Sequence, residues 1–303
     1  MFSMNKLTAD KRSQIVAMLV EGSSLRATAR MAGVSLNTVT KLLTDLGVVC
    51  SVYQDTALRD LDCKRIQADE IWSFVGAKEK HVKPDKREQG WGSVWTWTAI
   101  DADTKLVVSY RVGPRDVDEA VMLMRDLSRR VRNRVQITTD GLEEYRTGIE
   151  NAFGSDVDYA MIYKKCGTDQ DPRNPERRYS PSVCPEARPV PIIGNPDPAH
   201  MSTSYVERLN LTTRLSVRRF TRLTNGFSKK VENHIAALSL HFMHYNFCRV
   251  HKSLNGQTPA MAAGVTDHVW NLGELIGLLT AVEDAMPRTR GPYKPRQPKA
   301  ISN

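Results

Sequence analysis

Three acidic residues lie far apart in this chain, but each stands where a shared metal site would need it. Asp69 lies in the strand-like run IQADEIWSFVG, Asp140 closes the run VQITTD, and Glu207 opens the helical run YVERLNLTTRLSVRRF. Two carboxylates from strands and one from a helix could converge on one point. Carboxylate oxygens are the ligands that Mg²⁺ prefers, and two such ions can drive in-line phosphoryl displacement. The pattern predicts a site that cuts nucleic acid.

The residue after Asp69 is also acidic. Neighbouring side chains of a strand point to opposite faces of the sheet, so only one of Asp69 and Glu70 can point into the site. We expect Asp69 to do so and Glu70 to be a surface or structural partner, although a role for Glu70 in the site stays open. By the same alternation Trp72 shares the face of Glu70, where packing is expected and base stacking is the alternative.

The helix that follows Glu207 is organised around it. Glu207, Asn210, Arg214 and Arg218 are spaced i, i+3, i+7 and i+11, so they share one stripe of an α-helix. Residues 201 to 230 hold seven basic residues and one acidic residue. The stripe would align a metal-binding carboxylate with a carboxamide and two guanidiniums that face DNA phosphates. The alternative is an ordinary solvated charged face.

Composition limits the class of protein. The chain has 303 residues and a formal net charge of +9, which favours a polyanionic partner. Its cysteine count of five is odd and contains no C-x-x-C pair, which favours a reducing cytoplasm over a disulfide framework. No apolar run of about 20 residues occurs, and the start of the chain does not resemble a signal peptide, so we expect no membrane partner.

The first 50 residues resemble a helix-turn-helix unit. From Ser24 to Leu43, small residues allow a close helix crossing, Gly33 permits a tight turn, and Ser35 can cap the next helix. That second helix would present four polar side chains to a major groove: Asn37, Thr38, Thr40 and Lys41. The alternative is a small helical bundle that binds protein.

The period of the pattern changes from helical to strand-like after Lys64. The expected order is three strands, a helix, a strand, a helix, a strand and then further helices, from about 66 to 249. Residues 166–200 carry many prolines and are expected to be a long irregular insert. The tail from Pro287 is basic and rich in proline, and is expected to be disordered.

This chain order is that of the ribonuclease-H-like fold, in which carboxylates lie on the first strand, after the fourth strand and on a later helix. Asp69, Asp140 and Glu207 match those places. The block TSYVERLNLTTRLSVRRFTRLTNGFSKKVENH resembles bacterial insertion-sequence DDE transposases, closest to the insertion-sequence-one-like group. The later YNFCRVHKSLNGQTPAMAAG is similar to the integrase-core tail motif Y-N-x-x-R-x-H-x-x-L-x-x-x-T-P-A.

The resemblance implies an α/β fold, with a ribonuclease-H-like catalytic domain of five mixed strands and helices on both faces, behind a small all-α helix-turn-helix domain. The implied divisions are 1–50 for DNA binding, 51–64 as linker, 65–265 as catalytic domain and 266–303 as C-terminal helix and tail. Asp69 would bridge two Mg²⁺ ions, with Mn²⁺ as a substitute, and Asp140 and Glu207 would each hold one. Arg214 fills the basic position seven residues after the glutamate.

The implied function is that of a DDE transposase, which binds the ends of an insertion sequence and performs Mg²⁺-dependent cleavage and strand transfer. Its expected partners are double-stranded DNA and further copies of itself, as a dimer or higher assembly, in the nucleoid of a prokaryotic cytoplasm. Two alternatives stay open: a DNA-binding regulator with an inactive nuclease-like core, and a ribonuclease-H-like nuclease. The chain departs in one respect from the best-known members of the insertion-sequence-one-like group, which carry a zinc-binding N-terminal element. No residues with the spacing of zinc ligands precede residue 60.

The tail motif supplies the last group of candidate residues. Asn246, Arg249 and His251 are expected to brace the catalytic core. A zinc site is the alternative for the histidines and cysteine at helical spacing nearby, which are His241, His244, Cys248 and His251.

Overall fold

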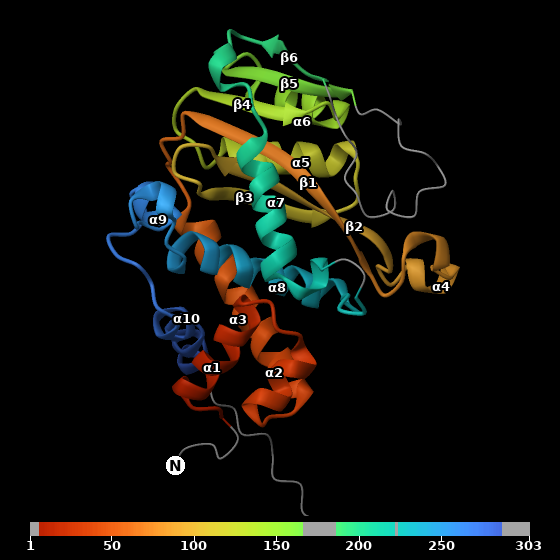
Figure 1. Ribbon diagram of the computed structural model, residues 1–303, viewed down its shortest axis with the longest axis vertical. Coiled ribbons are helices and arrows are strands. Elements are labelled where there is room, and N and C mark those ends of the chain that lie inside the picture. Colours follow the sequence, from red (N-terminus) through yellow and green to blue (C-terminus); the bar gives the residue numbers. More distant parts are fainter. Residues whose placement is uncertain (1–5, 166–185, 222–223, 287–303) are drawn as a thin grey trace, which may run out of the picture.

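The structure, a computed structural model, describes residues 6–165, 186–221 and 224–286 (Figure 1). The strands are β1 (Arg65–Val75), β2 (Gly92–Asp101), β3 (Val107–Gly113), β4 (Val135–Asp140), β5 (Val157–Lys165) and β6 (Glu186–Ile193). The helices are α1 (Ala9–Val20), α2 (Leu25–Ala32), α3 (Leu36–Ala57), α4 (Pro84–Arg87), α5 (Val117–Ser128), α6 (Glu143–Phe153), α7 (Ser204–Ser216), α8 (Val231–Met243), α9 (Pro259–Ala262) and α10 (Leu272–Ala285).

The six strands form one mixed sheet in the order β3-β2-β1-β4-β5-β6. β1 pairs antiparallel with β2, which pairs antiparallel with β3, whereas β4 and β5 run parallel to β1. Helices α5 and α6 pack on each other and α5 covers β2 and β3, while α7 crosses the other face over β1 (Figure 1). This is the ribonuclease-H-like arrangement, with helices on both faces, that the sequence predicted.

The centre of the sheet is largely buried because helices cover both of its faces. Trp97 of β2 is fully buried, and its ring meets the ring of Tyr145 of α6 edge to face, with centroids 5.3 Å apart. Its indole N–H donates to the carbonyl oxygen of Pro114 at 3.0 Å, so the buried donor is satisfied. This packing supports β1 and the residues that it carries.

The number of strands differs from the prediction. Five strands were expected, with residues 166–200 as an irregular insert, but residues 186–193 form β6 on the edge of the sheet, antiparallel to β5. Proline lacks an N–H and is tolerated on an edge strand when its nitrogen faces away from the neighbouring strand. Pro189 and Pro191 are two residues apart, so they face the same side. Residues 166–185 of the predicted insert lie outside the described residues.

α3 is one helix of 22 residues that continues to Ala57, so residues 51–57 of the predicted linker at 51–64 are helical. Its middle packs closely on α8. Gly47 permits this approach, since a Cβ added there would lie 2.5 Å from the Cα of Ala236. The division of the chain at residues 50 and 65 remains a prediction.

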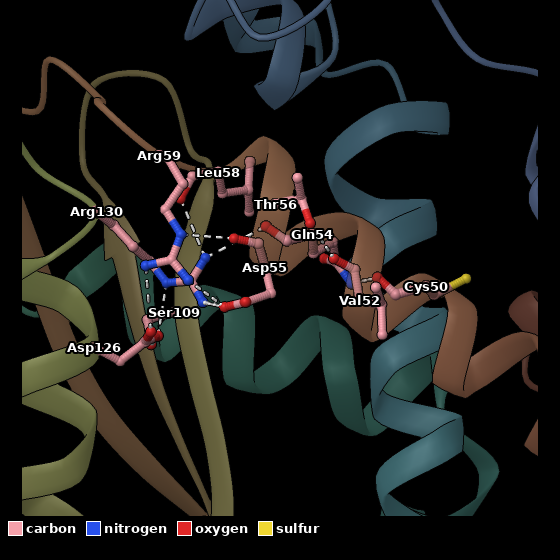
Figure 2. A network of polar contacts seen from close by, with 10 residues as sticks. All are labelled: Cys50, Val52, Gln54, Asp55, Thr56, Leu58, Arg59, Ser109, Asp126 and Arg130. Atoms are coloured by element: carbon pink, nitrogen blue, oxygen red, sulfur yellow. Dashed lines mark hydrogen bonds and ion pairs between the residues drawn. The ribbon is translucent and has the colours of Figure 1, made fainter.

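Arg130, just after α5, ties the C-terminal end of α3 to the sheet layer (Figure 2). Its guanidinium donates to the carbonyl oxygens of Gln54 and Leu58 at 3.3 and 3.2 Å, and to carboxylate oxygens of Asp55 and Asp126 at 2.7 and 2.6 Å. The Arg130 side chain is only 8% exposed. A buried guanidinium with this many acceptors holds both helices in one relative position.

The turn between α2 and α3 has the predicted geometry. Gly33 adopts a left-handed conformation with φ of 64°, which ends α2 and favours glycine. The Ser35 hydroxyl accepts from the amide of Thr38 at 3.1 Å and caps α3. The helix pair is therefore built as the sequence predicted, whatever it binds.

The helix after Glu207 is shorter than predicted. α7 ends at Ser216, and Arg218 belongs to a separate 3₁₀ turn, Arg218–Phe220. Arg218 therefore does not continue the stripe of Glu207. Among the described helices, none combines the length and the apolar character needed to cross a bilayer. The predicted disordered tail from Pro287 lies outside the described residues.

Candidate active site

Asp69 and Asp140 meet because their strands are parallel neighbours. The pairing of β1 with β4 ends at Ala68 opposite Thr139, so the next residue of each strand is one of the two aspartates. One carboxylate oxygen from each of Asp69, Glu70 and Asp140 lies within 4.8 Å of the others. We call these three residues the acidic cluster. The structure thus brings together two of the three predicted acidic residues, and adds Glu70.

Glu70 was expected to be a surface or structural partner, and the structure places it in the interior, close to Asp69 and Asp140. Its side chain is 3% exposed, pairs with the guanidinium of Arg115 at 2.7 Å, and accepts from the Tyr145 hydroxyl at 3.1 Å. Strand alternation sets the direction of the Cβ atom, but a glutamate chain is long enough for its carboxylate to reach back toward a strand end. Trp72, expected to pack, is 37% exposed, and its indole N–H donates to Ser93 at 3.1 Å.

Asn210 of α7 lies against Asp69. Its amide nitrogen donates to Asp69 Oδ2 at 2.8 Å, and Asp69 Oδ1 accepts from the amide of Glu70 at 2.9 Å. Asn210 is 9% exposed, and its Oδ1 is buried with no hydrogen-bond partner. Asn210 was predicted to face DNA, but the structure places it in the site beside Asp69. Its unpaired oxygen is a ligand that a hard cation accepts.

Glu207 lies in the first turn of α7 but outside the acidic cluster. Its Oε1 accepts from the ammonium of Lys164 on β5 and from the Thr203 hydroxyl, the latter at 2.8 Å. The Glu207 side chain is 48% exposed. The helix therefore brings Glu207 to the same end of the sheet, while its carboxylate is turned toward β5.

Burial and the neighbouring carboxylates both oppose ionisation of Asp69. Burial, followed by the carboxylates of Glu70 and Asp140, raises the pKa of Asp69 to about 8. Burial also raises the pKa of Glu70 and of Asp140. Glu207 differs: burial opposes its charge, but the hydrogen bonds from Lys164 and Thr203 outweigh burial and lower its pKa. A divalent cation placed among these oxygens would relieve the repulsion, so the residues fit such an ion.

The four residues predicted to read DNA lie on the first turns of α3. Asn37 and Lys41 are exposed, whereas Thr38 and Thr40 are half-buried. Lys41 pairs with Asp45 at 2.6 Å on the same helix. The exposed ends of this helix face are available to a partner, and their role in binding DNA stays a prediction.

Arg214 and Arg218 now have separate places. Arg214 is half-buried in the last turn of α7, and Arg218 is half-buried in the 3₁₀ turn beyond it. The chain therefore offers a basic segment that bends after Ser216 rather than one straight stripe. Contact of both arginines with DNA remains a prediction.

Asn246 bridges the end of the α8 segment to β3. Its side chain accepts from the Val107 amide and donates to the Val107 carbonyl oxygen, both at 3.0 Å. His251 packs edge to face on Tyr245, with centroids 4.8 Å apart, and Arg249 is exposed. These contacts support α8 against the sheet.

The zinc alternative gains no support. Within the part of the chain that the structure describes, the acidic cluster is the one group of three or more possible ligands close enough to share an ion. A π-helical turn, His244–Cys248, interrupts the helical spacing of the histidines and cysteine. His241 is buried, and burial together with His244 lowers its pKa to about 3.

Comparison with solved structures finds transposase chains at low identity. This chain is similar to the Mos1 transposase paired-end complex with left transposon end, at 15% identity and a TM-score of 0.22, over 52% of this chain and 60% of that one. It is also similar to the piggyBac transposase synaptic complex with hairpin DNA, at 12% identity and a TM-score of 0.37, over 96% of this chain and 76% of that one. The Mos1 mariner paired end complex with Mn matches at 14% identity and a TM-score of 0.24, over 80% of this chain and 78% of that one.

This chain therefore spans less than two thirds of the first of those chains. No family profile and no curated protein sequence matches it.

Proposed function

We propose that this chain is a DNA transposase of the DDE type, related to bacterial insertion-sequence enzymes, which binds the ends of an insertion sequence and catalyses strand cleavage and strand transfer. One observation carries the proposal. Asp69, inside β1, and Asp140, at the end of β4, meet where the two parallel strands stop pairing, and α7, which carries Glu207, docks on Asp69 through Asn210 at 2.8 Å.

Bound Mg²⁺ or Mn²⁺ would be held by Asp69, Asp140 and Glu207, and would supply charge neutralisation at phosphorus and activation of the attacking and leaving oxygens. The other residues of the site prepare this arrangement. Asn210 orients Asp69 by donating to one carboxylate oxygen. Arg115 balances the charge of Glu70, so the acidic cluster can stay partly buried before any cation arrives.

The DNA-binding part of the proposal rests on the N-terminal helices and the overall charge. Asn37, Thr38, Thr40 and Lys41 would enter a major groove, and Arg214 and Arg218 would contact phosphates near the site. The net charge of +9 favours such a partner. Because two ends of an element must be joined in one reaction, we propose a dimer or higher assembly on double-stranded DNA.

Strand transfer with labelled DNA that carries the ends of the element flanking this gene tests the proposal. Wild type is expected to cut and join these ends with Mg²⁺ or Mn²⁺. Asp140→Asn and Glu207→Gln should each reduce the rate by at least about 100-fold while DNA binding is kept. Glu150→Gln, an exposed carboxylate of α6 that pairs with Arg146, is the control and should leave the rate unchanged.

Two other outcomes would overturn the proposal. DNA binding by wild type without any cleavage, with both metals, would favour the regulator with an inactive core. The observation that favours this regulator is the orientation of Glu207, whose carboxylate is turned toward Lys164. Cleavage of RNA–DNA hybrids without joining of DNA ends would favour the ribonuclease-H-like nuclease.

A further inference from the structure

Lys164 is the one cation that touches a proposed metal ligand on the β5 side of the described site. Lys164 lies two residues beyond Ile162, and Ile162 pairs with Asp140 across β4 and β5. The side chains of Lys164 and Asp140 therefore lie on the same face of the sheet. The Lys164 ammonium donates to Glu207 Oε1. Its charge partly offsets the rise that burial causes in the pKa of Asp69 and of Asp140, and it contributes to the lowered pKa of Glu207. Lys164 therefore acts on all three proposed ligands.

The contact with Lys164 decides where the Glu207 carboxylate lies. Lys164 and Thr203 share the same oxygen, Oε1, and together they direct the carboxylate toward β5. The acidic cluster contains Asp69, Glu70 and Asp140, and Glu207 lies outside it. Both partners of the pair are partly exposed, Lys164 by 32% and Glu207 by 48%, so neither is locked by packing and the pair can open.

We propose that Lys164 is a built-in counter-ion that holds Glu207 outside the acidic cluster and competes with the divalent cation for it. The inference rests on the proposed function, because it assumes that the cluster and Glu207 together hold the metal. A lysine is a flexible single charge, whereas Mg²⁺ or Mn²⁺ carries two charges and binds oxygen more closely. Lys164 would therefore give way to such a cation, and Glu207 would turn toward the acidic cluster by rotation of its own side chain.

Displacement leaves the Lys164 ammonium without its carboxylate beside the site. A DNA phosphate is an anion that such an ammonium binds readily. When DNA offers Lys164 a phosphate, the free energy needed to release Glu207 falls, so DNA should strengthen metal binding. By linkage the metal should strengthen DNA binding by the same factor. Lys164 is thus a positioning residue that couples metal loading to the presence of the substrate.

Mn²⁺ titration of the full chain, with free Mn²⁺ followed by electron paramagnetic resonance, tests this role without measuring catalysis. Lys164→Met should bind Mn²⁺ about two- to fivefold more tightly than wild type, because a competing charge of the size found for partly exposed pairs is removed. Lys164→Arg keeps the charge and should behave as wild type. A short DNA duplex should tighten Mn²⁺ binding in wild type and change it little in Lys164→Met.

Lys6→Met is the matched control, because Lys6 also pairs with partly exposed carboxylates, those of Glu283 at 2.7 Å and Asp284 at 3.8 Å. It should leave Mn²⁺ affinity unchanged. Equal or weaker Mn²⁺ binding by a folded Lys164→Met, while wild type binds Mn²⁺, would overturn the competition alone. Absence of Mn²⁺ binding in wild type, with no further change in Asp140→Asn, would overturn the proposed metal site and the competition with it.

Discussion

Asp69→Asn tests whether the burial of the Asp69 carboxylate beside Glu70 and Asp140 limits the stability of the metal-free protein. Folding raises the pKa of Asp69 from 3.8 to about 8, through burial and then through Glu70 and Asp140. Between these pH values the folded state binds more protons than the unfolded state, so stability falls as pH rises. At about 1.4 kcal/mol for each pKa unit, the loss by pH 9 is at most about 6 kcal/mol.

The substitution should remove this loss without removing the hydrogen bonds. The carboxamide oxygen can still accept from the Glu70 amide, as Oδ1 does at 2.9 Å. The Asn210 carboxamide can turn over, so its unpaired Oδ1 accepts from the new amide group. The free energy of unfolding of Asp69→Asn should therefore match that of wild type near pH 4 and exceed it by several kcal/mol at pH 9.

Urea unfolding followed by circular dichroism, in EDTA between about pH 4 and pH 9, measures the difference. Asp158→Asn is the control of opposite sign, since hydrogen bonds from Arg134 and from the Asn195 amide lower the pKa of Asp158. That variant should be less stable than wild type at neutral pH, and the deficit should shrink as pH falls toward the lowered pKa. A difference between Asp69→Asn and wild type that stays constant across the pH range would refute the reasoning.

Three further substitutions test how the site is held. Gly47→Ala inserts a methyl group that would lie 2.5 Å from the Cα of Ala236 on α8, and it should cost about 1–3 kcal/mol in calorimetry. Gly277→Ala, in open space on α10, should gain about 0.5–1 kcal/mol. Arg115→Met leaves the buried Glu70 carboxylate without its cation and should cost about 2–3 kcal/mol in urea unfolding, a value reduced because the guanidinium is 39% exposed. Asn246→Leu leaves the amide and the carbonyl oxygen of Val107 on β3 without their side-chain partner, and it should cost about 2–4 kcal/mol. Amide hydrogen exchange on β3 should become faster, and unchanged exchange would contradict the role of Asn246.

The parts of the fold that depend on local patterning could be predicted from the sequence. Alternating β-branched and aromatic residues located β1 to β3, and the position of Asp140 at the end of a strand placed it beside Asp69. The turn at Gly33 and the cap at Ser35 follow from backbone conformation and side-chain chemistry within a few residues. Such signals need no knowledge of the rest of the chain.

The features that were missed depend on contacts distant in sequence. β6 is a strand because β5 offers it an open edge, and its prolines hide that from a local pattern. Glu70 joins the cluster because Arg115 and Tyr145, from two other elements, hold it there. The orientation of Glu207 toward Lys164 likewise depends on where β5 lies. The spacing of residues along the sequence does not predict these contacts.

The continuity of α3 sets a scale for the molecule. Its 22 residues span on the order of 33 Å, close to one turn of B-form DNA. One end carries Asn37 and Lys41, and the other is clamped to the sheet by Arg130. Because α3 is continuous between its two ends, a rotation of a partner bound at Asn37 and Lys41 would be passed on to the sheet as a rotation by the same angle. Under the proposed function, α3 would keep a fixed distance between the DNA-binding end and the acidic cluster, and the cut would fall at a constant number of base pairs from the recognised sequence.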